Sequence, residues 1–213
     1  MPDRAGVRDE DLLRRMAAGD EESFRLFYAR HQPPIYRFAL HMTGRPDAAE
    51  EVVQEAFMTL IREAGKFDAE RGAPQAFLYG IARNHVRRLM EREWRYQPLV
   101  DEDGLSEDTS ESSQNHSPNN YPNNGHSPAG YMLEGMTRAE IVEQVRSALG
   151  LLPLHYREAV TLCDLQEHDY ESAARIMDCP VGTVRSRLAR GREMLAARLR
   201  GVPAAKKSAG GAS

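Results

Sequence analysis

The chain has 213 residues, enough for two small domains, and a net charge of −4 with a pI near 6.0, which argues against a nucleic-acid binder. It has no apolar run that could span a membrane and no signal-peptide core at its N-terminus, so we expect a cytoplasmic protein without membrane insertion. Its two cysteines, Cys163 and Cys179, give neither a disulfide framework nor the spacing of zinc ligands. Buried packing or turn roles are more typical of such cysteines than redox chemistry, and we expect no metal and no cofactor.

Charge is distributed unevenly along the chain. Seven acidic residues and no lysine or arginine lie between Gln97 and Thr137, whereas six arginines and one acid lie between Val181 and Arg200. A basic stripe near an acidic segment is a common asymmetry in nucleic-acid-binding proteins. The overall charge therefore does not exclude DNA as a partner.

Residues 9–96 are predicted to be helical throughout. Asp20 can cap a helix whose first turn is acidic, and the pair Pro33-Pro34 predicts a kink or break within that helix. Asp47, with a glutamate three residues later, has the spacing of a capping box and predicts the start of the next helix.

The helix that begins at Asp47 has a polar face outside its apolar stripe, and that face includes Glu51, Gln54, Glu55 and Met58. The acids at its start complement the helix dipole and need no other explanation. Met58 is different, because an exposed methionine among acids more often marks a protein contact, although single exposed apolar residues are common. Partner binding is therefore the slightly favoured interpretation of this face.

Pro74 predicts the start of a third helix, because its missing N–H costs nothing there, and this helix is expected to end near Tyr96. Outside its apolar side the helix carries basic residues together with two aromatic ones, Tyr79 and Trp94. Arginines interleaved with aromatic rings suit single-stranded DNA, whose bases stack and whose phosphates meet cations. Alternatively, the two rings pack against neighbouring helices. The polar residues of this face are Arg83, Asn84, Arg87, Arg88, Arg92 and Arg95.

Residues 97–137 are rich in Ser, Asn, Pro and acids and poor in apolar residues, so they are expected to form a flexible linker. Residues 138–200 are predicted to be a second helical domain, and residues 201–213 a flexible tail. The sequence shows no strand of useful length, no Gly-rich phosphate loop and no nucleophile–base pair at motif spacing. The predicted fold class is therefore all-α, with two small helical domains joined by a long acidic disordered linker.

The most informative stretch is a predicted helix-turn-helix. A short helix at residues 170–177 is followed by the turn 178–180, whose proline cannot continue it, and a second helix runs from residue 181 to about residue 199. One face of this second helix is apolar, and the other offers guanidinium and hydroxyl groups that suit base edges and phosphates. The alternative interpretation is an arginine-rich helix that is exposed to solvent and does not bind DNA. The polar face consists of Thr183, Ser186, Arg187 and Arg190, with Arg185 and Arg192 on its flanks.

Both halves together resemble a bacterial sigma factor of the extracytoplasmic-function group. Residues 152–162 resemble the family's "LP…REAV.L" pattern, and residues 180–192 resemble its recognition-helix signature. In the first domain, residues 50–57 (EEVVQEAF) resemble the "ED.VQE.F" of region 2.2, and residues 77–84 (FLYGIARN) resemble the "WLY.IARN" of region 2.3. The helix-turn-helix would then belong to region 4.

This resemblance implies an alternative sigma factor, not an enzyme, which binds the clamp helices of core RNA polymerase and recognises −35 and −10 promoter elements. Residues 1–96 would be region 2 and residues 138–200 region 4, the linker would run through the polymerase, and an anti-sigma factor is a further expected partner. The implied residues are Thr183, Arg185, Ser186, Arg187 and Arg190 for duplex −35 DNA; Lys66, Phe67, Asp68, Arg83, Asn84, Arg87 and Arg88 for the melted −10 strand; and Glu50, Glu51, Gln54, Glu55 and Met58 for polymerase.

An alternative function involves DNA binding without RNA polymerase. The protein would then be a helix-turn-helix transcriptional regulator with a ligand- or partner-binding N-terminal domain. That alternative accounts for the second domain equally well, but not for a basic-aromatic helix and an acidic helix together in the first. An enzyme has no supporting arrangement of residues in the sequence.

Overall fold

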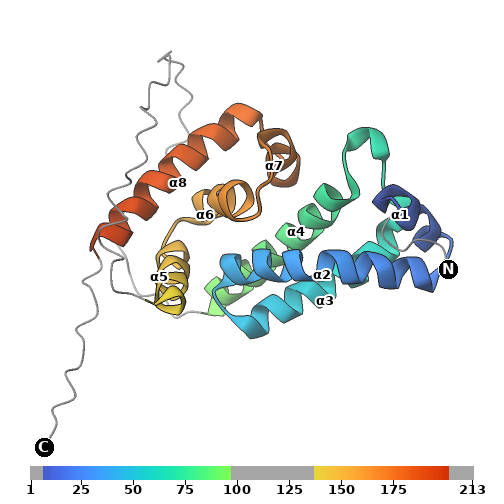
Figure 1. Cartoon of the computed structure of the whole chain (residues 1–213), viewed down its shortest axis with the longest axis horizontal. Helices are drawn as coiled ribbons and strands as arrows, with labels where there is room; N and C mark the ends of the chain where they lie inside the picture. Colours follow the sequence, from blue (N-terminus) through green and yellow to red (C-terminus); the bar gives the residue numbers. More distant parts are fainter. Residues whose placement is uncertain (1–6, 97–136, 202–213) are drawn as a thin grey trace, which may run out of the picture.

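The computed structural model describes residues 7–96 and 137–201, and within these ranges all regular structure is helical, which confirms the predicted fold class. Helices α1–α4 form one group and α5–α8 a second group that packs beside it (Figure 1). The predicted linker and tail fall almost wholly on residues outside the described ranges. The helices are α1 Asp9–Ala17, α2 Glu21–Thr43, α3 Pro46–Glu63, α4 Pro74–Tyr96, α5 Arg138–Gly150, α6 Leu154–Val160, α7 Tyr170–Met177 and α8 Val181–Gly201. Short 3₁₀ turns at Ala64–Lys66 and Ala69–Arg71 join α3 to α4, and a π-helical turn, Thr161–Leu165, follows α6.

Helix α2 is continuous through Pro33-Pro34. The sequence predicted a kink or a break at this pair, and the break does not occur. The two prolines remove the amide donors that would meet the carbonyls of Ala29 and Arg30, one turn earlier. Both of these residues are exposed, so water can reach the carbonyls that the prolines leave free. Burial of apolar residues before and after the prolines then holds the helix together.

The capping predictions met different outcomes. The carboxylate of Asp20 accepts a hydrogen bond from the backbone N–H of Glu22 at 3.1 Å and caps α2 as predicted. The predicted capping box at Asp47 is wrong, because α3 already begins at Pro46 and Asp47 lies inside its first turn. A proline at the first helical position has the required φ and no N–H to satisfy, so the helix can start there without a side-chain cap.

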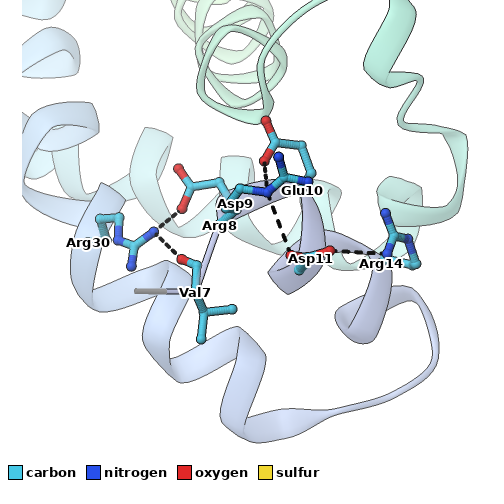
Figure 2. A network of polar contacts seen from close by, with 7 residues as sticks. All are labelled: Val7, Arg8, Asp9, Glu10, Asp11, Arg14 and Arg30. Atoms are coloured by element: carbon cyan, nitrogen blue, oxygen red, sulfur yellow. Dashed lines mark hydrogen bonds and ion pairs between the residues drawn. The ribbon is translucent and has the colours of Figure 1, made fainter. Parts of the chain in front are cut away.

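Polar contacts attach the start of α1 to the middle of α2 (Figure 2). Arg30 donates to the backbone carbonyl of Val7 at 3.2 Å and also pairs with the carboxylate of Asp9. The second oxygen of Asp9 lies 2.7 Å from Nε2 of His31, which is buried. These contacts fix α1 against α2, where Leu12 and Leu13 complete the apolar core.

A single apolar core extends through both groups of helices. Phe38 of α2 and Leu78 of α4 belong to it, as do Leu149 of α5 and Leu162 beyond α6. Arg157 adds a polar tie, because its buried guanidinium donates to the carbonyls of Gly150 and Leu152 and, across the two groups, to that of Met42. The two domains are therefore held against each other by apolar packing and by buried hydrogen bonds.

Acid is expected to destabilise this fold, because burial lowers the pKa of several histidines below its ordinary value of 6.5. The unfolded chain then binds more protons than the native one as pH falls through 6.5, so the stability present above that value is progressively lost. Denaturant unfolding should give a smaller free energy at about pH 5.5 than at about pH 7.5. An equal or larger value at the lower pH would contradict this prediction. The histidines are His31, His41, His85, His155 and His168.

Candidate functional site

The helix-turn-helix forms with the predicted boundaries. Asp169 caps α7 by accepting a hydrogen bond from the N–H of Ser172 at 2.6 Å, and Asp178 ends α7 with a left-handed backbone (φ 51°). Helix α8 then begins directly after Pro180. Val184 and Leu188 are buried against α7 and α6, so the opposite face of α8 is turned outward.

The outward face of α8 lines an open hollow of about 330 Å³ together with His155 and Tyr156 of α6. Arg190 is exposed there and has no hydrogen-bond or ion-pair partner among the described residues. Local periodicity did not single out the two α6 residues, because only the tertiary packing of α6 on α8 brings them to this face. The residues of α8 in the hollow are Thr183, Ser186, Arg187 and Arg190, four of the five predicted for −35 DNA.

Two other arginines of α8 are engaged by their own domain. The guanidinium of Arg185 lies 5.3 Å from the centroid of the Tyr170 ring, a cation–π contact that leaves the side chain exposed. Arg192 donates two hydrogen bonds, of 2.9 and 2.6 Å, to the carboxylate of Asp164. Arg192 therefore anchors α8 to the turn after α6, whereas Arg185 remains accessible at the edge of the basic face.

An apolar groove of about 380 Å³ lies between α2 and α3. Met58 and Ile61 are each 49% exposed and Tyr28 is 39% exposed, so the groove is uncovered in this structure. Tyr28 and Phe57 pack with ring centroids 4.7 Å apart and form part of its floor. The full lining is Phe24, Tyr28, Gln32, Tyr36, Glu50, Val53, Gln54, Phe57, Met58 and Ile61.

The structure divides the residues predicted to bind polymerase between two sides of α3. Glu50, Gln54 and Met58 line the apolar groove, whereas Glu51 and Glu55 face α4. Glu51 accepts a hydrogen bond from Arg92 of α4 at 3.0 Å. The α2 residues of the groove were not predicted, although Phe24, Tyr28, Gln32 and Tyr36 recur every four residues and so share one face of a helix.

The loop before α4 forms a small pocket of about 160 Å³, and two of the residues predicted for the −10 strand, Phe67 and Asp68, line it. Phe67 packs on Phe77 with ring centroids 5.7 Å apart, and Asp68 accepts a hydrogen bond from the N–H of Glu70 at 3.0 Å. Arg175 of α7 also lines the pocket. Lys66, the third predicted loop residue, is exposed and pairs with Glu63 at 3.3 Å.

On α4, Asn84, Arg87 and Arg88 are exposed, as the prediction of a basic face requires. The placement of Arg83 on that face is wrong in this structure, because its side chain is buried and paired with Glu158 of α6. Tyr79 is only 1% exposed, which agrees with the alternative that its ring packs against neighbouring helices. The side chains of Trp94 and Arg95 lie outside the described part of the chain.

The described residues contain no group of three or more His, Cys, Asp or Glu that could hold a metal ion. No helix within the same ranges combines the length and the apolar character needed to cross a membrane. A helix-turn-helix with a basic outer face, packed on a helical body with an exposed apolar groove, defines a DNA-binding protein that also has a surface for another macromolecule.

Comparison with known proteins identifies the family. The sigma-70 region 2 family model matches residues 27–96, and the sigma-70 region 4 model matches residues 142–195. The chain is 33% identical over 189 residues to the ECF RNA polymerase sigma-E factor of Haemophilus influenzae, an alignment that covers 89% of this chain and 94% of that one. It is 32% identical over 188 residues to the RNA polymerase sigma-H factor of Pseudomonas aeruginosa, with 88% and 92% covered. The chain belongs to the ECF sigma factors, which are non-catalytic initiation factors of RNA polymerase.

Solved structures share this fold. The sigma factor RpoE of Bartonella quintana, in complex with the anti-sigma factor NepR, has a TM-score of 0.59 and 26% identity, covering 84% of this chain and 98% of that one. CnrH, in complex with the cytosolic domain of CnrY, has a TM-score of 0.63 and 22% identity, covering 90% and 97%. The alternative function, a helix-turn-helix regulator that does not act with polymerase, does not account for the match of the sigma-70 region 2 model to α2–α4.

Proposed function

We propose that residues 1–96 and 138–200 act as the two promoter- and polymerase-binding domains of this sigma factor, joined by the linker 97–137 and followed by the tail 201–213. The chain itself is then not an enzyme, and core RNA polymerase in the cytoplasm performs the catalysis. The observation that carries the proposal is the uncovered apolar groove between α2 and α3 on the region 2 domain. An exposed apolar groove of this kind is typical of a protein–protein interface. Because it lies on the domain that the sigma-70 region 2 model matches, the partner we infer is core RNA polymerase.

The groove suits a helix of the polymerase clamp. Most of its lining is aromatic or aliphatic, and Glu50 and Gln54 add polar groups at its edge. An apolar centre with a polar rim is the usual composition of a protein interface. Glu51 and Glu55, on the other side of α3, contribute to docking in this proposal only at the margin of the contact.

Promoter DNA would meet both domains. The hollow beside α8 offers Arg190 to a base edge of the −35 duplex, with Thr183 and Arg187 toward phosphates. Arg185 and Ser186 would also lie toward base edges in the major groove of the DNA. In the first domain, the pocket that contains Phe67 and Asp68 would receive an extruded −10 base. Lys66 and Asn84 are exposed and do not line this pocket, so they would contact the base or its strand from outside it. Arg87 and Arg88, which are exposed on α4, would follow the melted strand, whereas Arg83 is buried against Glu158 in this structure.

An anti-sigma protein is the further partner we infer. The similar structure of Bartonella quintana RpoE contains the anti-sigma factor NepR, and a protein of that kind could cover the apolar groove when the sigma factor is not needed. Such a partner would compete with polymerase for the same exposed apolar residues.

Run-off transcription from a randomised promoter library tests the proposal. Core RNA polymerase with this chain should yield transcripts whose templates share two spaced promoter elements, and core polymerase alone should not. If polymerase remains active with another sigma factor but gives no transcript that depends on this folded chain, the proposed function is wrong.

Arg190→Ala is expected to weaken binding to the selected promoter about tenfold, or ~1.4 kcal/mol, and to relax the base preference at one −35 position. The reason is that Arg190 is exposed in the hollow and free to make a forked contact with a guanine edge. Arg200→Ala, near the far end of α8, is the matched control and should leave the base preference unchanged. Competition binding with promoter variants measures both effects, and an unaltered preference in Arg190→Ala would exclude base reading by this residue.

A further inference from the structure

The hollow beside α8 has a second wall, which belongs to α6 and carries polar groups. His155 and Tyr156 line the hollow from this helix, and their rings are in contact, with centroids 4.0 Å apart. His155 is exposed and Tyr156 is partly buried. Among the described residues, neither the imidazole nor the phenol hydroxyl has a hydrogen-bond partner. Both side chains can therefore donate a hydrogen bond to a molecule that enters the hollow.

A close approach between α6 and α8 fixes the position of this wall. Gly191 follows Arg190 directly and is buried in the contact, where a Cβ atom would lie 3.0 Å from the carbonyl oxygen of Tyr156 and 3.5 Å from its Cβ. Because no side chain separates the two helices there, Tyr156 is held beside the turn of α8 that carries Arg187 and Arg190. Helix packing therefore sets where the polar groups of α6 lie relative to the residues of α8 proposed to contact DNA.

The charge around the hollow suits an anion. Arg187 and Arg190 line it together with two hydroxyl residues, and no acid is among the described residues that line it. Glu158 lies one turn further along α6, but its side chain is buried and paired with Arg83. A backbone phosphate of DNA carries the complementary charge, and its oxygens accept hydrogen bonds from guanidinium, imidazole and hydroxyl groups alike.

His155 is placed to change its protonation when such an anion binds. Burial lowers its pKa below the ordinary value of 6.5, and the positive charge of Arg187 lowers it further. The turn Thr161–Leu165 also packs on α6, but its acid, Asp164, is paired with Arg192. No charged group of α2, the other neighbour of α6, acts on His155 within the described ranges. A phosphate between His155 and Arg187 would oppose the effect of the arginine and favour the protonated imidazole.

We propose that His155 and Tyr156 of α6 bind a backbone phosphate of the −35 duplex together with Arg187, while Arg190 reads a base edge. The proposal rests on the proposed −35 role of the second domain. Donors from two helices then hold one phosphate, which fixes the register of α8 on the duplex without adding a base preference. Because the phosphate favours the protonated imidazole, DNA binding takes up a proton, and the affinity rises as the pH falls.

The test uses the full chain and a labelled duplex selected from a random-sequence pool by binding to that chain. His155→Gln keeps a hydrogen-bond donor but cannot take up the proton, and Tyr156→Phe removes only the hydroxyl. His85→Gln is the matched control, because burial also lowers the pKa of His85, which lies on α4 and not in the hollow. Fluorescence anisotropy measures affinity at about pH 7.5 and about pH 6.0 over a range of salt concentrations. Circular dichroism at both pH values checks that each variant is folded.

The wild type and His85→Gln should bind about fivefold more tightly at the lower pH, within the limit of about tenfold per pH unit that one proton allows. His155→Gln should lose this rise, and its salt dependence at the lower pH should be shallower by about one phosphate contact. Tyr156→Phe should bind about threefold more weakly at both pH values, for the loss of one hydrogen bond. Neither α6 variant should alter the base preference.

His155→Gln with the pH and salt dependence of the wild type would overturn the phosphate contact, and so would a changed base preference in that variant. Arg190→Ala, measured on the same duplex, separates the two levels of the argument. If Arg190→Ala weakens binding and the α6 variants do not, the contact from α6 is wrong and the −35 role of α8 stands. If none of the three variants alters binding, the −35 role is wrong as well.

Discussion

Placing aspartates in the apolar groove, as Met58→Asp with Ile61→Asp, should reduce the affinity for core RNA polymerase at least about 100-fold, or ~2.8 kcal/mol. Both side chains are half exposed and stand at the open side of the groove, so the change need not disturb the core beneath them. If an apolar helix of polymerase fills this groove, two carboxylates would be buried without partners. A few central apolar residues usually dominate such an interface.

Titration of labelled protein with core polymerase measures this affinity. Val142→Asp is the matched control, because Val142 is also an aliphatic residue about half exposed (48%) but lies on α5, away from the groove. The control should bind polymerase like the wild type. Equal affinity of the double variant, with its helicity intact, would show that polymerase does not use the groove.

Elements fixed by local chemistry could be predicted from the sequence to within a residue or two. The helix-turn-helix is the best example: the proline at residue 180 is a local signal for the turn, and α8 begins directly after it, as predicted. The structure adds two further local features that the prediction did not include, a side-chain cap at Asp169 and a left-handed end at Asp178. Pro74 marked the start of α4 in the same way. Continuity of α2 through Pro33-Pro34 could not be predicted, because it depends on which face of the helix is exposed.

The candidate site was predictable where it depends on one helix and not where it depends on two. Helical periodicity placed Arg190 on an outer face, and it is there. The same periodicity placed Arg83 outside the apolar side of α4, yet it is buried by a carboxylate 75 residues away in the sequence. Tyr28 and Ile61 belong to different helices and form a groove only once α2 packs on α3. Contacts of this kind carry no signature within either segment.

A single methyl group at the contact between α6 and α8 is expected to cost the second domain much of its stability. Gly191 is buried in α8, and a Cβ atom there would lie 2.7 Å from Cγ2 of Val160 and 3.0 Å from the backbone carbonyl oxygen of Tyr156. Neither neighbour can yield easily, since valine is stiff at χ1 and the oxygen belongs to a helix backbone. Gly191→Ala should therefore lower the free energy of unfolding by about 3 kcal/mol, despite the better helix propensity of alanine.

Gly182→Ala provides the matched control for this prediction, because it makes the same change in the same helix at a position where a Cβ atom would meet nothing within 4 Å. At that position only the higher helix propensity of alanine affects the free energy of unfolding, so the variant should be as stable as the wild type or more stable by up to about 1 kcal/mol. Urea unfolding followed by circular dichroism gives both values. Since α8 holds the proposed −35 residues and rests on α6, Gly191→Ala should also lose promoter binding as the temperature rises, while Gly182→Ala should retain it. Equal stability of the two variants would mean that α6 and α8 pack less closely than this geometry requires.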